Sequence, residues 1–66
     1  MQLSIKAARV NANLTQQELA EAVGVTTQTI NSWENGRREP KVSQAKALCE
    51  TLGVCMDDIF FPRITN

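Results

Sequence analysis

The fold is decided by residues 14–40, which read LTQQELAEAVGVTTQTINSWENGRREP. Thr15 and Glu18 are spaced as a T-x-x-E capping box, which satisfies free backbone N–H groups at the start of a helix. Gly24 ends that helix, because glycine accepts the positive φ that many helix ends require. A second helix begins at the next suitable N-cap, Thr26. The stretch therefore predicts two helices joined by a tight turn.

The apolar spacing within this stretch indicates a helix-turn-helix. Two helices that cross steeply need a small residue where they meet, a positive φ in the turn and a branched apolar residue between them. These three properties are supplied in order by Ala20, Gly24 and Ile30. Trp33 stands one turn after Ile30 and is expected in the core. Asn35-Gly36 ends the second helix.

With those apolar residues buried, the outer face of the second helix is polar and carries no acidic residue. It consists of Thr26, Thr27, Gln28, Asn31 and Ser32. Such side chains can bond to base edges in a DNA major groove, where Gln suits adenine and Thr can touch a thymine methyl. Gln16 and Gln17 open the first helix, whose free N–H groups and positive dipole end attract phosphate. An ordinary solvated face has the same composition, and it is the position within the motif that favours base contact.

The rest of the chain is also helical in pattern, and no run of alternating β-branched residues indicates a strand. We expect helices at about residues 3–12 and from residue 42 or 43 to 52, with a short turn at 56–60, which gives an all-α fold. The inner face of the 42–52 helix is expected to be Val42, Ala45, Leu48, Cys49 and Leu52. Most of the apolar residues that follow are expected in the core, with one or two in a dimer seam: Met56, Ile59, Phe60 and Phe61. Pro62 closes the part that we expect to be ordered.

The composition bounds the class of protein. Sixty-six residues suffice for one small domain, residues 1–66 with an ordered core at about 3–61, and so small a core gains from dimerisation. Net charge is zero, with a basic excess of two in residues 1–46 and an acidic excess of two in residues 47–66. This polarity suits a domain with one anion-facing side. Without a membrane-spanning run or a signal-like N-terminus, a reducing cytoplasm is the expected compartment.

Several kinds of chemistry are not expected. Cys49 and Cys55 should be free and buried in a reducing compartment, and with no histidine they cannot supply four zinc ligands within one chain. The sequence has no metal-ligand cluster, glycine-rich phosphate loop or nucleophile with an evident base, so we expect neither an enzyme nor a cofactor. A small-molecule ligand is not expected either, because there is no second domain to form a pocket.

Residues 14–40, together with Leu52-Gly-Val54 and Asp57-Asp-Ile-Phe60, closely resemble the phage repressor and Cro family of helix-turn-helix regulators, also called XRE-type. The resemblance covers about residues 5–60. It implies a compact five-helix, lambda-repressor-like DNA-binding domain that binds double-stranded operator DNA, usually as a dimer on a two-fold site. Such a bacterial or phage-encoded regulator is expected in the cytoplasm, associated with the nucleoid.

Matched residue by residue, the resemblance implies three groups of site residues. The base-reading or groove-facing group adds Gln16 to Thr27, Gln28 and Ser32. The phosphate-contacting loop holds Asn35, Arg37 and Arg38, to which we add Gln17 and Lys41. The third group is a structural ion pair, Arg9 with Glu34. Arg9 lies on the same helical face as Ile5 and Ala12, which favours that pairing over two unrelated surface charges.

Two residues depart from the pattern of the family. Cys55 replaces the serine that usually caps the last helix, so we expect a weaker cap there. Lys41 occupies a common cap position of the 42–52 helix, which leaves the start of that helix open. A neutral chain is also unusual for a lone DNA-binding domain, so tight binding is expected of a dimer rather than of a monomer.

The expected function is therefore a sequence-specific, repressor/Cro-like transcriptional regulator that acts as a homodimer through its C-terminal region. Two alternatives stay open. An antitoxin of a toxin–antitoxin pair would use the same DNA face and hold a toxin with its C-terminal surface. A protein-interaction module that has lost DNA binding is favoured modestly by the neutral charge.

Overall fold

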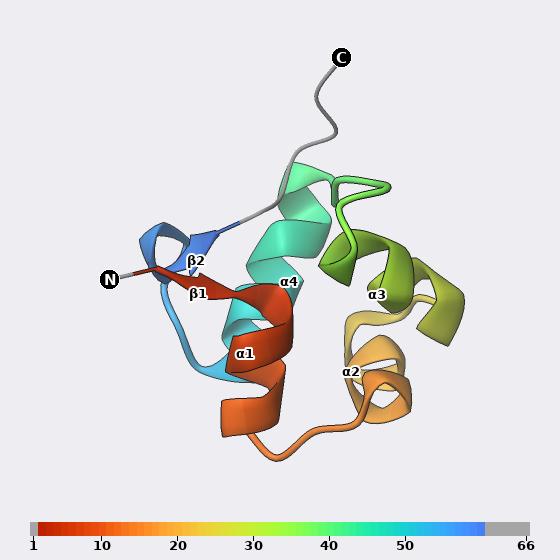
Figure 1. Ribbon diagram of the computed structural model, residues 1–66, viewed down its shortest axis with the longest axis horizontal. Helices are drawn as coiled ribbons and strands as arrows, with labels where there is room; N and C mark the ends of the chain where they lie inside the picture. The colour runs from red at the N-terminus through yellow and green to blue at the C-terminus, as the bar shows by residue number, and fades with distance from the viewer. Residues whose placement is uncertain (1, 61–66) are drawn as a thin grey trace.

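The structure is a computed structural model that describes residues 2–60. Within them lie four α-helices, one 3-10 turn and two short strands. In chain order these are β1 (Leu3–Ser4), α1 (Ile5–Asn11), α2 (Gln16–Val23), α3 (Thr27–Glu34), α4 (Val42–Leu52), η1 (Met56–Asp58) and β2 (Ile59–Phe60). Figure 1 shows α2 and α3 together on one side of the molecule, the two strands on the opposite side, and α1 and α4 between them.

The expected five-helix, all-α architecture is wrong in two respects. The fifth helix is only the three-residue η1, and the strands β1 and β2 pair in parallel with Leu3 opposite Ile59 and Ser4 opposite Phe60. Two-residue strands are too short to show the alternation by which a strand is recognised in a sequence. The strands form because residues 3–4 and 59–60 meet beside α1. There each strand supplies hydrogen-bonding partners for the backbone of the other.

The first helix begins at Ile5, two residues later than predicted, and it ends at Asn11, one residue earlier. Ser4 is its N-cap, and the Ser4 hydroxyl accepts a hydrogen bond from the Ala7 backbone N–H at 3.0 Å. A serine at the N-cap takes an extended backbone conformation, which allows the same residue to lie in β1.

The starts predicted for α2 and α3 are confirmed. In the capping box of α2, Thr15 Oγ1 accepts from the Glu18 N–H at 3.0 Å, and Glu18 Oε1 accepts from the Thr15 N–H at 2.8 Å. Thr26 caps α3 through a 3.2 Å bond from the Thr29 N–H. The start of α4, which the sequence left open, lies at Val42. There Gln44 Oε1 accepts from the Lys41 N–H at 2.9 Å.

Each of the four α-helices is followed within two residues by a residue with positive φ. At the end of α2, Gly24 has a φ of 85°, and the Val25 N–H donates to the Ala20 carbonyl at 2.9 Å. This six-to-one bond is the signature of a Schellman motif, which turns the chain sharply while satisfying a terminal carbonyl. The expected glycine stop at Gly24 is therefore confirmed. The corresponding residues with positive φ after α1, α3 and α4 are Asn13, Gly36 and Gly53.

The core lies where α1, α2, α3 and α4 meet. Ala20, Ile30 and Trp33 are buried in it, as the helix-turn-helix spacing predicts. The prediction for Val42 is wrong: this residue is 70% exposed, because it is the first residue of α4 and lies outside the buried cluster. The remaining members of the α4 inner face are buried as expected: Ala45, Leu48, Cys49 and Leu52.

The C-terminal apolar residues are less buried than predicted. Ile59 is in the core, whereas Met56 is 39% exposed and Phe60 is 52% exposed. In a strand successive side chains point to opposite sides, so burying Ile59 turns Phe60 outward. The predictions for Phe61, as a core or dimer residue, and for Pro62, as the end of the ordered part, concern positions outside the described residues.

Both cysteines in the structure are free, as expected, but only one is buried. Cys49 lies in the core, and Cys55 is exposed because it precedes the surface turn η1. The prediction that both thiols are buried is therefore wrong for Cys55. Among residues 2–60, none of the helices has the length and apolar character needed to cross a membrane.

Candidate nucleic-acid interface

The outward face of α3 is polar and uncharged. Ile30 and Trp33 turn the other side of the helix into the core. Thr27, Gln28 and Asn31 are consequently exposed, and Ser32 is half-buried. The only charged residue within α3 is Glu34, at its end. Uncharged donors and acceptors at these positions can approach base edges without repelling the phosphates beside them.

Thr26 has a structural task in addition to its expected place on this face. Its Oγ1 accepts from the Thr29 N–H, and it lies 2.9 Å from Thr29 Oγ1. These contacts hold the Thr26 hydroxyl at the first turn of α3. Its main role in the structure is therefore to start the helix that carries Thr27 and Gln28.

The loop after α3 turns back along the outward face. Gly36, with a φ of 74°, allows the Arg37 N–H to donate to the Ser32 carbonyl at 2.9 Å. The backbones of both arginines thereby lie beside the last turn of α3. A hollow of about 340 Å³ separates helix and loop, and it is lined by Thr26, Gln28, Thr29, Asn31, Ser32, Arg37 and Arg38. The fold thus brings predicted base-reading and predicted phosphate-contacting residues to one polar hollow.

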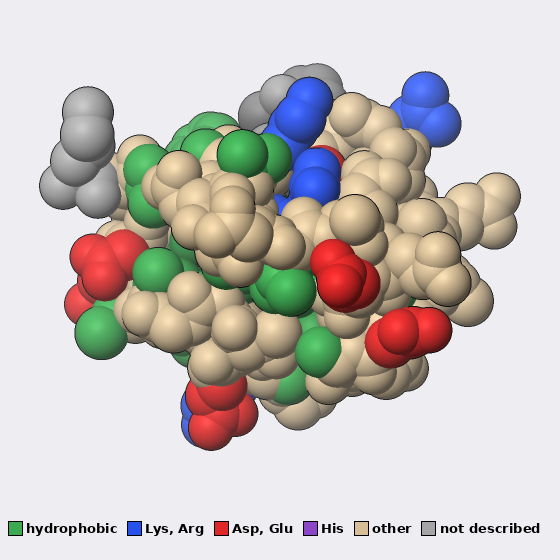
Figure 2. Space-filling model, turned by 90° about the horizontal axis from the view of Figure 1, so that it is seen from below, with side chains coloured by type: hydrophobic (Ala, Val, Ile, Leu, Met, Phe, Trp, Pro, Cys, Tyr) green, Lys and Arg blue, Asp and Glu red, His purple; other side chains and the backbone are tan. Residues whose placement is uncertain are grey.

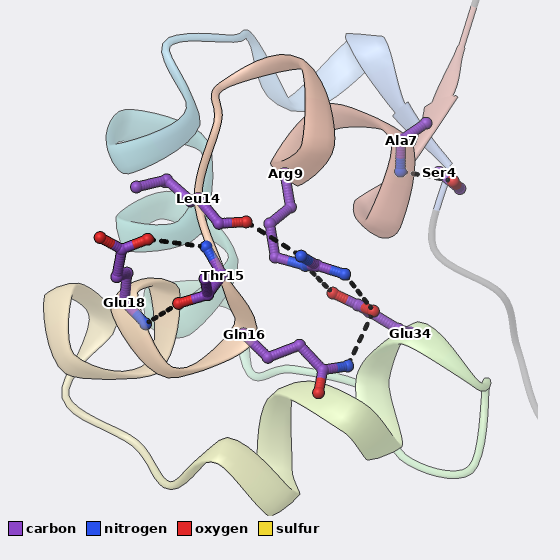
Figure 3. A network of polar contacts seen from close by, with 8 residues as sticks. All are labelled: Ser4, Ala7, Arg9, Leu14, Thr15, Gln16, Glu18 and Glu34. Carbon is purple, nitrogen blue, oxygen red and sulfur yellow. Dashed lines mark hydrogen bonds and ion pairs between the residues drawn. The ribbon is translucent and has the colours of Figure 1, made fainter.

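Three of the expected site residues form one network between helices (Figure 3). Arg9 of α1 donates to Glu34 of α3 through Nε at 2.7 Å and through Nη2 at 3.3 Å. The Arg9 Nη1 also donates to the Leu14 carbonyl at 2.9 Å, before the start of α2. The side chains of Arg9 and Glu34 are only 11% and 4% exposed. The pair therefore holds α1 and the chain before α2 against the end of α3.

Gln16 joins the same network. Its Nε2 donates to Glu34 Oε1 at 3.0 Å, so one N–H of the amide is already bonded within the protein. Sequence reasoning placed Gln16 among the base readers and Gln17 among the phosphate contacts. In the structure Gln16 is half-buried, whereas the next residue, Gln17, is exposed. The oxygen and the second N–H of the Gln16 amide are the groups left for a ligand.

The charges near α3 are arranged in favour of an anion. Glu34 is paired with Arg9, and the loop between α3 and α4 holds three exposed basic residues, Arg37, Arg38 and Lys41, against one acidic residue, Glu39. Figure 2, which looks from below the view of Figure 1, shows mostly uncharged polar surface on the side of α2 and α3, together with some acidic side chains. Hydrophobic side chains gather instead toward the side of the strands. The polar side is the one that suits a nucleic acid.

Asn35, expected among the phosphate contacts, bonds first to its own helix. Its Nδ2 donates to Asn31 Oδ1 at 3.0 Å. Sequence reasoning missed this contact, although the two residues are four apart, a spacing at which helical side chains meet. It also missed the bond from Gln16 to Glu34. No local pattern relates two residues eighteen positions apart, so only the packing of α2 on α3 reveals that contact.

Known proteins resemble this chain over nearly its whole length. A helix-turn-helix family model matches residues 5–59. A transcriptional regulator of this type from Methanothermobacter thermautotrophicus, itself uncharacterized, is 44% identical over 61 residues, which cover 91% of this chain and 88% of that protein. Another from Methanocaldococcus jannaschii is 38% identical over 60 residues, 91% of each chain.

A longer relative matches with part of its length. The transcriptional activator BcrR of Enterococcus faecalis is 33% identical over 51 residues, which cover 77% of this chain and 25% of that protein. In the full-length relatives and in the family model alike, the matched segment includes the two helices built around Gly24. This chain therefore belongs to the XRE-type helix-turn-helix family of transcriptional regulators.

Proposed function

We propose that this protein is a sequence-specific DNA-binding regulator that reads an operator in the major groove with α3. The observation that carries the proposal is the outward face of α3. Thr27, Gln28 and Asn31 are exposed there, the one acidic residue of α3, Glu34, is paired with Arg9, and Arg37 and Arg38 flank the exposed face. Uncharged hydrogen-bonding groups beside cations are what a base edge between two phosphate rows requires.

The roles of the base-reading residues follow from their chemistry. Gln28 offers both an acceptor and a donor, which match the adenine edge in the major groove, and the Thr27 methyl can pack on a thymine methyl. Ser32 is half-buried and reaches the groove from the last turn of α3. Gln16 approaches from the start of α2 with the amide groups that Glu34 leaves unbonded.

The phosphate contacts surround this face. Arg37, Arg38 and Lys41 are exposed in the loop after α3, and Gln17 is exposed at the start of α2. Guanidinium and ammonium groups bind phosphate strongly and without regard to sequence. Their place in the proposal is to hold α3 in register while the uncharged residues discriminate between bases.

The regulator acts, in this proposal, as a repressor-like homodimer joined through its C-terminal region. Met56 and Phe60 are exposed apolar side chains, and they lie near the strands, on the other side of the molecule from α3 (Figure 1). A contact there leaves both copies of α3 uncovered. Two recognition helices about 34 Å apart then reach successive major grooves on one side of the duplex.

Selection of bound duplexes from a random pool tests the proposal. We expect the wild-type protein to enrich a two-fold symmetric site, and Gln28→Ala to lose preference at one position of each half-site. Asn11→Ala is the matched control, because Asn11 is an exposed amide on α1 and is not among the residues proposed to contact DNA. Failure of the wild-type protein to enrich any sequence would overturn the DNA-reading role. Enrichment of isolated half-sites alone would overturn the dimer.

A further inference from the structure

We propose that Asn35 is a positioning residue that orients the amide of Asn31, so that Asn31 presents donors rather than an acceptor to the DNA. The inference rests on the proposed function, because it concerns how α3 reads bases. It assigns Asn31 a preference for bases that offer acceptors in the major groove, above all guanine. It also gives Asn35 a role different from the phosphate contact expected of it.

The geometry fixes Asn35 to Asn31 at two points. The Asn35 backbone N–H donates to the Asn31 carbonyl at 3.0 Å, and Asn35 Nδ2 donates to Asn31 Oδ1 at 3.0 Å. Asn35 is the C-cap of α3, and the positive φ of Gly36 immediately turns the chain away. The side chain of Asn35 is therefore held against its own helix at the point where the helix stops.

Asn31 lies where its amide can meet a base. It is exposed, one turn after Thr27 and Gln28 on the outward face, and it helps to line the polar hollow shared with the arginines. Among residues 2–60, Asn35 is the one side chain that bonds to the Asn31 side chain. Both N–H groups of Asn31 Nδ2 are therefore available, and they lie on the opposite arm of the amide from the bonded oxygen.

The hydrogen-bonding capacity of the amide then determines the base. An unconstrained asparagine pairs with adenine by accepting from the adenine N6 amino group and donating to N7. Here the Asn31 oxygen accepts from Asn35 and is held toward that residue, with one lone pair left, whereas both N–H groups are unbonded on the opposite arm of the amide. Guanine presents two acceptors in the major groove, O6 and N7, and thymine presents O4. Asn31 held by Asn35 accordingly favours guanine, and thymine after it, over adenine.

The experiment compares base preferences of three proteins in the same selection from random duplexes. Asn31→Ala identifies the position that Asn31 reads, because preference there is lost. At that position we expect the wild-type protein to favour guanine or thymine. Asn35→Ala frees the Asn31 oxygen, and we expect the ratio of adenine to guanine to rise by roughly fivefold to tenfold, the lower part of what one bidentate base contact discriminates.

A third variant tests the polarity of the contact. Asn35→Asp places an acceptor where the donor stood, so Asn31 must turn an N–H toward residue 35 and its oxygen outward. We expect the same shift toward adenine, together with weaker binding at all sequences from the added negative charge. Arg38→Ala is the control that lowers affinity without altering the preference. Thermal melting of each variant shows that it is folded.

The outcomes separate this inference from the proposed function. A wild-type protein that enriches no sequence overturns the proposed function itself. A wild-type protein that enriches a site but favours adenine at the Asn31 position overturns the inference alone. The inference is also overturned if Asn31→Ala alters no position, or if Asn35→Ala weakens binding uniformly with the preference unchanged. The last result would make Asn35 a phosphate contact.

Discussion

Arg9 Nε lies 2.7 Å from Glu34 Oε2, and this ion pair joins the first helix of the chain to the last residue of α3. Both side chains of the pair are almost completely buried, and Glu34 accepts a further hydrogen bond from Gln16. An exposed ion pair contributes about 1 kcal/mol or less, whereas loss of one partner from a buried pair leaves an uncompensated charge. The network therefore both stabilises the fold and fixes the position of α3.

Arg9→Ala is expected to destabilise the protein by on the order of 3 kcal/mol, because Glu34 would stay covered and unpaired. Lys6→Ala is the matched control: Lys6 is exposed on the same helix, and its removal should cost less than about 0.5 kcal/mol. Urea unfolding of both variants measures the difference. A double variant, Arg9→Met with Glu34→Leu, should recover part of the loss, and equal midpoints for the two single variants would contradict the prediction.

Gly24→Ala is expected to cost about 1–2 kcal/mol, the penalty for a side chain in the left-handed region. A Cβ at Gly24 meets nothing within 4 Å, so the cost is one of backbone conformation and not of collision. Gly53→Ala is the control, since Gly53 has a similar φ of 71° and equally open surroundings. The two variants should lose similar stability in thermal unfolding. A much larger loss at Gly24 would mean that the turn between α2 and α3 tolerates no adjustment.

The helix-turn-helix could be predicted because its signals are local. Thr15 with Glu18, Gly24 and Thr26 each act within a few residues of chain, through capping bonds or a single φ value. The buried positions of α2 and α3 follow from the helical period once those ends are known. These segments were accordingly placed to within a residue.

The remainder depends on contacts between distant parts of the chain. The pairing of Leu3 with Ile59 joins opposite ends, and neither two-residue strand has a pattern of its own. Val42 fits the apolar stripe of α4, yet its exposure depends on where the neighbouring helices stop. In the candidate site, residue types indicated which side chains face outward. The bonds that tie Gln16 to Glu34 and Asn35 to Asn31 required the folded arrangement.

Thr26→Ala is expected to destabilise the protein by about 1 kcal/mol through loss of the N-cap of α3. Thr26→Ser keeps the hydroxyl that accepts from the Thr29 N–H and should retain most of the stability. Circular dichroism during thermal unfolding gives both values. If the serine variant is as unstable as the alanine variant, the threonine methyl and not the cap supports this turn.

One thiol should react quickly in the folded protein and two in urea, because Cys55 is exposed and Cys49 is buried. Burial raises the pKa of the Cys49 thiol above its usual 9.0, and the nearby Cys55 and Asp58 add to the rise. The unfolded thiol ionises first as pH increases, so the stability that Cys49 contributes is present below pH 9.0 and is lost as pH rises through its folded pKa. Titration with a chromophoric disulfide reagent counts the thiols. Rapid reaction of the single cysteine in a Cys55→Ser variant would contradict the burial of Cys49.

Arg37→Ala is expected to weaken DNA binding similarly at all sequences and to flatten its dependence on salt. Each phosphate contact on duplex DNA adds about 0.9 to the slope of log K against log salt, since binding releases a counterion there. Fluorescence anisotropy from low to high salt should therefore give a slope smaller by about one for each protomer. Lys46→Ala removes the same charge from the exposed side of α4, beyond the proposed interface, and should leave the slope almost unchanged. If both variants change the slope equally, the affinity depends on the total charge of the protein, and the loop after α3 makes no specific contact with the phosphates.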